Sequence, residues 1–409
     1  MKTPFPTQCS ALEPLASFID LYIAQVKEQG FSDPYIRVQV KVLKLCDRWM
    51  NQSGLQVGSL CEAAMGDCLR HLSRLSHLSY LSQAVPPTLR RFLIMLRKLG
   101  VSPQEKPEAK SQLEQLIGQY ERYLREERNL SPNSIDQPLL FARRFMDDLF
   151  GCGPMKLSTL RAPDVTGYIQ RHAYDHGPCH TRSLVGSTRT FLRYLYYKGL
   201  VDTDFSLAVP KVARWRFSTL PKHLPAAQVR QVLRHCERKT ALGQRNYAIL
   251  LLLARLGLRA NEIVNLRLED IDWDNARLTV CGKGQIWAQL PLPADVEKSI
   301  ATYLQNGRPK CNSRRLFIRD HAPFEGFRRN TTISNIVQRA LARAGVVSAR
   351  KGAHLLRHSL ATEMLRKGAS LVEIGEVLRH RSSDSTAIYA KVDLTTLRAL
   401  ALPWIGGAQ

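Results

Sequence analysis

The chain has 409 residues, 44% hydrophobic and 23% charged, a globular composition that excludes an intrinsically disordered protein. It carries 59 Lys and Arg against 35 Asp and Glu, and the net charge of +24 predicts an anionic partner. Nucleic acid is the first candidate, because phosphates bind Lys and Arg with release of counterions. The alternative is a generically basic protein, and the length predicts two or three domains.

The sequence contains no recognisable membrane segment, signal peptide or metal motif. No stretch is apolar for long enough to span a bilayer, and the first residues, MKTPFPTQCSALEP, lack the apolar core of a signal peptide. We therefore expect a cytoplasmic protein. The nine cysteines are scattered without close pairs, so we expect reduced, mostly buried thiols and no cofactor or metal.

Two helical blocks come first along the chain. Apolar residues recur at helical spacing in LASFIDLYIAQVKEQ, YIRVQVKVLKLCDRWM and TLRRFLIMLRKLG, and the prolines of VSPQEKPEAK mark a linker. We place an N-terminal helical domain at 1–105 and a second helical domain at 110–205. A basic stretch with three prolines follows at 206–225, and it is predicted to be an extended linker because proline and the residue before it resist helix.

The two helical blocks are interpreted as copies of one module. A shift of 99 residues aligns identical residues at the start of one helix and through the last helix of each block. The aligned pairs are Ser32 with Ser131, Ile36 with Ile135, Arg90 with Arg189, Phe92 with Phe191, Leu93 with Leu192, Leu96 with Leu195, and Gly100 with Gly199.

The third block, 226–409, mixes helices with one β-hairpin. Helical spacing marks QVRQVLRHCE and NYAILLLLARLG, whereas RLTVCGKGQIWAQLPLP alternates around a Gly-Lys-Gly turn, as a hairpin does. Helices resume from Thr332. The sequence as a whole therefore predicts a mainly α fold with a small antiparallel β-sheet, the sheet lying in an α+β third block.

His354 and Arg357 are the first candidate functional pair. Three residues apart on a helix, they lie about 60° from each other around its axis. Gly352 predicts that this helix begins near His354, where a helix start favours anions. A single histidine beside apolar residues is more often structural, and we interpret His358 in that way.

Arg259 and Glu262 form a second candidate pair. Arg259 follows the turn LGL at the end of an apolar helix, and Glu262 is a candidate partner that orients it. Two rigid arginines, Arg259 and Arg357, would make a fork-shaped clamp for the oxygens of one phosphate. The alternative for Arg259 and Glu262 is a surface ion pair, which contributes little.

Three more residues have a functional and a structural interpretation. Lys283 lies between two glycines at the hairpin tip, where it can donate a proton to a ligand or simply be solvated. His380 ends the helix SLVEIGEVL, and Ser382 or Ser383 can cap a next helix that carries Tyr389. Most tyrosines are packing residues, but a phenol is a competent nucleophile beside a neutralised phosphate.

Four stretches, taken in order, resemble the tyrosine recombinase (phage-type integrase) family: LGLRANEIVNLRLEDID, CGKG, HLLRHSLATEML and LRHRSSDSTAIYAKV. The resemblance covers residues 220–392, so 226–409 would be the catalytic domain with a C-terminal tail. The block at 110–205 resembles the family's helical core-binding (SAM-like) domain, and 1–105 would duplicate it.

The resemblance implies a phosphoryl-transfer role for the central residues. Arg259 and Arg357 would clamp the scissile phosphate, and Tyr389 would attack it to give a 3′-phosphotyrosyl DNA intermediate and a free 5′-hydroxyl. The ester conserves the bond for resealing. Because arginines supply the positive charge, no metal is implied.

The remaining candidates take part in proton transfer and phosphate contact. Lys283 would protonate the leaving 5′-oxygen, His354 would assist proton transfer near the tyrosine, and His380 would hydrogen-bond the phosphate. One departure from the family concerns the residue before His380, which is often glycine and here is Arg379. A second departure is the additional first block.

We therefore expect a site-specific DNA recombinase, encoded by a mobile element that integrates or excises. Its partners would be double-stranded DNA and, because strand exchange needs four active sites, a tetramer with itself or other recombinases. In a bacterium it would lie at the nucleoid when bound to DNA. A type IB topoisomerase-like enzyme and an inactive DNA-binding accessory protein are the alternatives. The first block is either a further DNA-binding module or a docking surface for another subunit.

Overall fold

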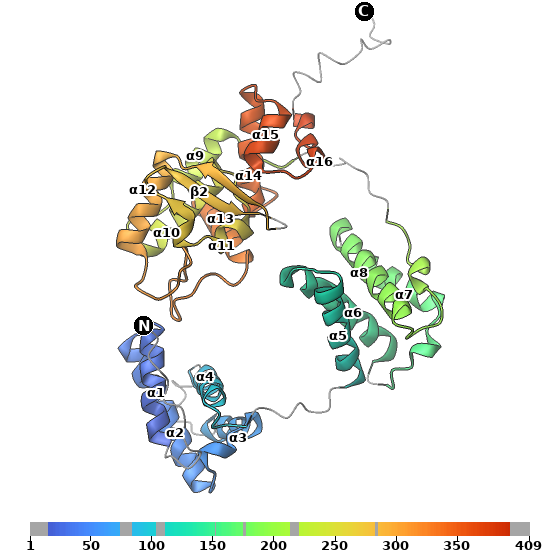
Figure 1. The fold of residues 1–409 in the computed structure, drawn as a ribbon, viewed down its shortest axis with the longest axis vertical. Coiled ribbons are helices and arrows are strands. Elements are labelled where there is room, and N and C mark those ends of the chain that lie inside the picture. Colours follow the sequence, from blue (N-terminus) through green and yellow to red (C-terminus); the bar gives the residue numbers. More distant parts are fainter. Residues whose placement is uncertain are drawn as a thin grey trace, which may run out of the picture. The chain divides into compact units, whose positions relative to one another are not determined.

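The computed structural model describes residues 15–73, 84–103, 111–151, 153–174, 177–212, 221–282 and 285–392. Two compact units are present, one formed by the described residues between 105 and 216 and the other by the remaining described residues. Most described elements are helices, with one small sheet (Figure 1). This confirms the predicted fold class.

The first helical block folds around its own apolar core. Its helices are α1 (Leu15–Glu28), α2 (Asp33–Gln52), α3 (Glu62–Ser73) and α4 (Val85–Lys98), with a 3₁₀ turn at Val57–Ser59. Phe18, Leu43 and Phe92 are fully buried in that core. The helices predicted in this block are present, because their apolar residues at helical spacing form one continuous buried stripe.

The second helical block repeats this arrangement. It contains α5 (Gln112–Arg122), a π turn at Tyr123–Glu127, α6 (Pro132–Phe150), a 3₁₀ turn at Leu157–Thr159, α7 (Ala162–Tyr174), α8 (Pro178–Tyr197) and a 3₁₀ turn at Phe205–Ala208. Tyr120, Phe145 and Phe191 are fully buried in its core. Ser111 caps α5, because its Oγ accepts a hydrogen bond of 3.2 Å from the backbone nitrogen of Glu114.

The elements of the two blocks correspond at the spacing that the identities predicted. α2 and α6 begin at Asp33 and Pro132, and α4 and α8 end at Lys98 and Tyr197, so both pairs are 99 residues apart. Gly100 and Gly199, which follow the last helices, both have positive φ, 73° and 66°.

Each of the two blocks has an equivalent aromatic contact inside its own core. The ring of Tyr22 meets Phe92 edge-on at 5.7 Å between centroids, and the ring of Tyr120 meets Phe191 edge-on at 4.9 Å. In each block, a tyrosine of the first helix therefore packs on a phenylalanine of the last helix.

The start of the range predicted as an extended linker has a different structure. Val209 is buried and belongs to the core of the second block. Arg189 of α8 donates hydrogen bonds to the carbonyl oxygens of Val209 and Pro210, at 3.1 and 3.0 Å. Because the segment offers apolar side chains to that core, residues 206–212 pack on the second block. Residues 213–220, which include most of the basic stretch, lie outside the described residues.

The third block begins with helices around one long apolar helix. α9 (Ala226–Arg234), α10 (Ala241–Arg255), α11 (Ala260–Asn265), α12 (Ala294–Thr302) and α13 (Thr331–Arg343) contribute to its core, with a π turn at Tyr303–Gly307. Residues 248–253 of α10 are all at most 1% exposed. A helix that is apolar on every side is a central core helix.

The sheet has three antiparallel strands in the order β1-β2-β3: β1 (Ile271–Asp272), β2 (Arg277–Cys281) and β3 (Trp287–Pro291). The ladder between β2 and β3 closes with Cys281 opposite Trp287, at the tip of the predicted hairpin. A 3₁₀ turn at Leu268–Asp270 precedes β1.

The C-terminal helices of the third block form a smaller core next to the site. These are α14 (Ala353–Arg366), α15 (Leu371–Leu378) and α16 (Ser383–Ala387), followed by a 3₁₀ turn at Ala390–Val392. Ala361, Ile374, Leu378 and Tyr389 are buried together in this core. Residues from 393 onward, the predicted tail, lie outside the described residues.

Candidate active site

Arg259 is the N-cap residue of α11, and a tight turn places it there. Gly257 in that turn has a φ of 57°, and a Cβ at this position would lie only 2.8 Å from Leu378 Cδ2 and 3.0 Å from Leu360 Cδ2. Glycine is therefore required both by the backbone conformation and by the close packing against α14 and α15. The turn brings α11 against the helices that carry the other candidates.

Glu262 holds Arg259 at two points. Nη1 of Arg259 donates to Oε1 of Glu262, and the backbone nitrogen of Arg259 donates to Oε2, both at 2.8 Å. The side chain of Glu262 is only 2% exposed. Glu262 thus makes the contacts that its predicted role, to orient Arg259, requires. The alternative of a surface ion pair is wrong because the carboxylate is buried.

Arg379 is a second cation on the same carboxylate. Its Nη2 lies 3.0 Å from Oε2 of Glu262, and its side chain is 12% exposed. Arg379 is the C-cap of α15 in the left-handed conformation, with φ 55° and ψ 51°. This position often carries glycine in the family that the chain resembles, and the left-handed backbone is a physical reason for that preference.

Arg357 of α14 is buried, and its guanidinium group binds backbone carbonyls. It donates to the carbonyl oxygens of Gly257 and Leu378. Arg259 donates through Nη2 to the carbonyl oxygen of Arg379 at 3.0 Å. Both predicted clamp arginines therefore bind the peptide segment 378–379, directly before His380, although they are 98 residues apart in the sequence.

The site has an excess of positive charge. Burial, followed by the positive charges of Arg259 and Arg379, lowers the pKa of Arg357 to about 10. Three guanidinium groups thus lie close together with the carboxylate of Glu262 between two of them. An anion bound here would relieve this repulsion, which is the electrostatic property of a phosphate site.

The two predicted histidines lie beside these arginines. Desolvation and the charges of Arg357 and Arg259 lower the pKa of His354, although its side chain is on the surface. The same causes lower the pKa of His380 to about 4. Nδ1 of His380 lies 2.7 Å from Oγ1 of Thr386, and the His380 ring is parallel to that of Tyr389, at 6.4 Å between centroids and 4° between planes.

Tyr389 is buried, and its position differs from the predicted one in a helix. α16 ends at Ala387, and the backbone nitrogen of Tyr389 donates to the carbonyl oxygen of Thr386 at 2.9 Å in a turn. Ser382, one of the two predicted caps, accepts from the Asp384 nitrogen at 3.3 Å. The Tyr389 side chain is 1% exposed, and burial raises its pKa to about 12, against the opposing effect of Arg357.

The hydroxyl of Tyr389 contacts His358, which is not among the residues predicted to form the site. Nδ1 of His358 lies 2.8 Å from the Tyr389 hydroxyl oxygen, and the two rings meet edge-on. The sequence predicts a structural role for His358. The sequence feature that could have identified His358 as a site residue is its spacing, since it lies four residues after His354 on the same face of α14.

Lys283 lies outside the described residues. The residue before it, Gly282, is close to the clamp: a Cβ at Gly282 would lie 3.9 Å from Nη1 of Arg259 and 3.7 Å from Oε1 of Glu262. The hairpin therefore reaches Arg259 at the residue that precedes the predicted proton donor.

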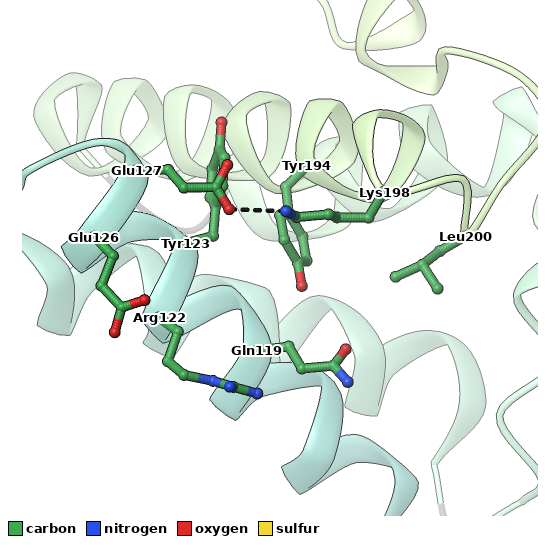
Figure 2. Close-up of a pocket in the computed structure, with 8 residues that line it drawn as sticks. All are labelled: Gln119, Arg122, Tyr123, Glu126, Glu127, Tyr194, Lys198 and Leu200. Carbon is green, nitrogen blue, oxygen red and sulfur yellow. Dashed lines mark hydrogen bonds and ion pairs between the residues drawn. The ribbon is translucent and has the colours of Figure 1, made fainter.

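A separate pocket of about 410 Å³ lies in the second helical block (Figure 2). Its lining residues are Gln119, Arg122, Tyr123, Glu126, Glu127, Tyr194, Lys198 and Leu200. Lys198 lies 2.8 Å from a carboxylate oxygen of Glu127, so these two charges form an ion pair in the pocket. It contains none of the candidate residues.

The described residues include neither a candidate metal-binding group nor a candidate membrane-spanning helix. Among them, no three His, Cys, Asp or Glu side chains are grouped so that they could bind a metal ion. No helix in that part of the chain has the length and apolar character needed to cross a membrane.

Comparisons with known proteins identify the class of this fold and site. Residues 222–395 match the phage integrase family. The integrase/recombinase y4rA of Sinorhizobium fredii (strain NBRC 101917 / NGR234) is 41% identical over 97% of this chain and 96% of its own length. Tyrosine recombinase XerC of Oceanobacillus iheyensis is 31% identical over 70% of this chain and 95% of its own length.

Solved structures show the same fold. XerH site-specific recombinase, bound to a palindromic difH substrate, covers 99% of both chains with a TM-score of 0.54 at 16% identity. A lambda integrase dimer bound to a core site covers 67% of this chain and 94% of its own, with a TM-score of 0.52 at 14% identity.

The chain belongs to the phage integrase (tyrosine recombinase) family. It is a tyrosine-type site-specific recombinase, an enzyme class that cleaves and joins DNA. The comparisons therefore favour recombination over both alternatives, the topoisomerase-like enzyme and the inactive accessory protein.

Proposed function

We propose that this recombinase cleaves double-stranded DNA through a 3′-phosphotyrosyl ester on Tyr389 and rejoins it during integration or excision of a mobile element. The observation that supports this most is the convergence of Arg259 and Arg357 on the peptide before His380, whose ring lies against that of Tyr389. Two rigid guanidinium groups offer the paired donors that one phosphate accepts.

The reaction transfers one phosphoryl group. The Tyr389 oxygen forms a bond to phosphorus, the bond from phosphorus to the 5′-oxygen breaks, and Lys283 protonates that oxygen. His354 accepts the proton of the phenol. With Nδ1 of His380 engaged by Thr386, its Nε2 is available to donate to a phosphate oxygen. Resealing reverses these steps with a new 5′-hydroxyl.

The nucleophile has to move before it can react. The Tyr389 hydroxyl is buried and bonded to His358, so a DNA phosphate cannot reach it in this arrangement. α16 has only five residues, and Tyr389 lies in the turn after it. A short helix followed by turns can be displaced without unfolding the larger core around α10.

Double-stranded DNA is the proposed partner, with a tetramer of recombinase subunits for strand exchange. The net charge of +24 and the DNA-bound structures of XerH and lambda integrase support this proposal. The second block, α5 to α8, would be the core-binding domain, and the third block the catalytic domain.

The first block would be a duplicate of the second that contacts DNA phosphates. Arg37, Lys41, Lys44 and Arg48 are all exposed on α2 at spacings that place them along one face over about 16 Å. The corresponding exposed residues of α6, 99 positions later, are Asp136, Leu140, Arg143 and Asp147. Only the first copy therefore presents a continuous basic stripe here, and a polyanion such as DNA fits it better than an ordinary protein surface.

A nicked suicide substrate tests the chemistry. Genomic fragments carrying nicks trap the covalent protein–DNA adduct, and sequencing the attached ends identifies the site and shows whether it borders a mobile element. We expect Tyr389→Phe to form no adduct while its DNA affinity changes by no more than about threefold. Tyr197→Phe, at an exposed tyrosine of α8, should form adducts normally. Adducts in Tyr389→Phe would show that another residue is the nucleophile.

A further inference from the structure

We propose that His358 is a positioning residue that holds the nucleophile in a resting position: it binds the Tyr389 hydroxyl and keeps the phenol buried against α14 until DNA displaces it. This proposal rests on the proposed role of Tyr389. It assigns a function to a histidine that takes no part in the phosphate clamp.

The contact has the geometry of a specific hydrogen bond. The Tyr389 oxygen and Nδ1 of His358 are 2.8 Å apart, and the ring centroids are 5.7 Å apart with 61° between planes. The two residues are 31 positions apart in the sequence and lie on different elements. The bond therefore ties the turn after α16 to α14.

The protonation state and the tautomer of His358 decide the direction of the bond. Burial, together with His354, Arg350, Arg357 and His223, lowers the pKa of His358 to about 4, so the ring is neutral at pH 7. We assign the proton of the neutral ring to Nε2, and in this tautomer Nδ1 accepts the hydrogen bond that the phenol donates. Burial raises the pKa of Tyr389 to about 12, so the phenol keeps its proton in the resting position, where a phosphate cannot reach it.

His358 is the acceptor that the buried hydroxyl requires. A buried hydroxyl without a partner costs about 1–3 kcal/mol, and this cost opposes burial of the phenol. With the acceptor present, the buried position is favoured. Without it, the balance shifts toward positions in which water or a phosphate satisfies the hydroxyl. The adjacent Arg357 would bind that phosphate, so the same turn of α14 carries both the resting partner and part of the clamp.

Two substitutions of His358 distinguish the effect of its hydrogen-bond acceptor from the effect of its side-chain shape. His358→Leu removes the acceptor and keeps an apolar volume. His358→Asn keeps an oxygen near the position of Nδ1. We expect nitration of Tyr389 by tetranitromethane, which needs an accessible phenol, to rise at least about threefold in His358→Leu and to stay near the wild-type level in His358→Asn.

The assay has internal references. Tyr197, which is 66% exposed, reports ordinary reactivity. His235→Gln is the control because Nδ1 of His235 lies 2.9 Å from the carbonyl oxygen of Gln231, four residues earlier. Wild-type Tyr389 should react at least about tenfold more slowly than Tyr197. Equal reactivity of the two tyrosines in the wild type, or unchanged protection in a folded His358→Leu, would overturn the proposal.

The rate of cleavage of the nicked suicide substrate measures the effect of His358 on the reaction. Single-turnover adduct formation should be about threefold to tenfold faster in His358→Leu than in the wild type, and His358→Asn should stay within about twofold. Slower cleavage in a folded His358→Leu would mean that the contact serves the reaction and does not restrain it. If His358→Leu does not fold, the deciding measurement is nitration of Tyr389 in the wild type with and without duplex DNA. DNA should increase this nitration, and unchanged nitration would overturn the proposal. Failure of the proposed function is separate, because it appears as adducts in Tyr389→Phe.

Discussion

Glu262 binds Arg259 through both carboxylate oxygens, one on the guanidinium group and one on the backbone nitrogen, each at 2.8 Å. Arg379 shares the second oxygen at 3.0 Å. A single buried carboxylate therefore fixes the position of a predicted clamp residue and of the backbone that leads into His380.

Glu262→Gln should weaken both the fold and the site. The amide has only one acceptor oxygen, so at least one of its three donors loses its partner and a positive charge remains uncompensated. We expect the free energy of unfolding to fall by about 3 kcal/mol, measured by urea denaturation, with loss of adduct formation. Glu269→Gln is the control, because Glu269 pairs with Arg314 at the surface, and it should lower the free energy of unfolding far less than Glu262→Gln. Equal effects of the two substitutions would contradict the structural role of Glu262.

Substitutions of Arg379 separate backbone conformation from the ion pair. Arg379→Ala loses the contact with Glu262 and keeps the cost of the left-handed conformation, whereas Arg379→Gly loses the contact and relieves that cost. We expect Arg379→Gly to be more stable than Arg379→Ala by about 1 kcal/mol and both to be less stable than the wild type. A glycine variant at or below the stability of the alanine variant would rule out the left-handed backbone as the reason for glycine here.

The histidines of the site predict a loss of stability in mild acid. Burial and nearby arginines hold the pKa of His358 and of His380 at about 4, below the value of about 6.5 in an unfolded chain. The unfolded state binds protons first, so stability is fully present above pH 6.5 and falls as the pH drops toward 4. Urea midpoints between pH 7.5 and 4.5 should fall less steeply in His358→Asn than in the wild type, and identical slopes would argue against a neutral, buried His358.

The basic stripe of α2 predicts a salt-dependent contribution to DNA binding. Lys44→Gln with Arg48→Gln removes two of its charges, and the slope of log affinity against log salt should decrease by about 2. Lys239→Gln with Lys298→Gln removes two exposed charges from the third block and should change the slope less. Fluorescence anisotropy with one duplex at several salt concentrations measures both, and an unchanged slope in the α2 variant would exclude the stripe from the DNA interface.

Local sequence patterns were sufficient to predict much of the fold and part of the site. Apolar spacing was sufficient to locate α1, α2, α4 and α10, because a helix buries residues that recur every three to four positions. The Gly-Lys-Gly turn located the hairpin, and the spacing of His354 and Arg357 placed both on α14. The partnership of Arg259 with Glu262 was predictable for the same reason, since the two are three residues apart.

Long-range contacts were not accessible in this way. Arg379 meets Glu262 across 117 residues, and the two clamp arginines meet at one peptide segment because α11, α14 and α15 pack around the Gly257 turn. Periodicity identifies which face of a helix is buried but contains no information about the angle at which two helices cross.

The sequence by itself determined the family, the mainly helical fold and the identity and order of the candidate residues, because residue types and local spacing are one-dimensional properties. Only the tertiary structure decided that Tyr389 is buried, that its hydroxyl binds His358, and that Arg379 has a left-handed backbone and contacts Glu262. Burial and hydrogen-bond partners depend on how separate helices pack, and that packing emerges from the summed contacts of the whole core.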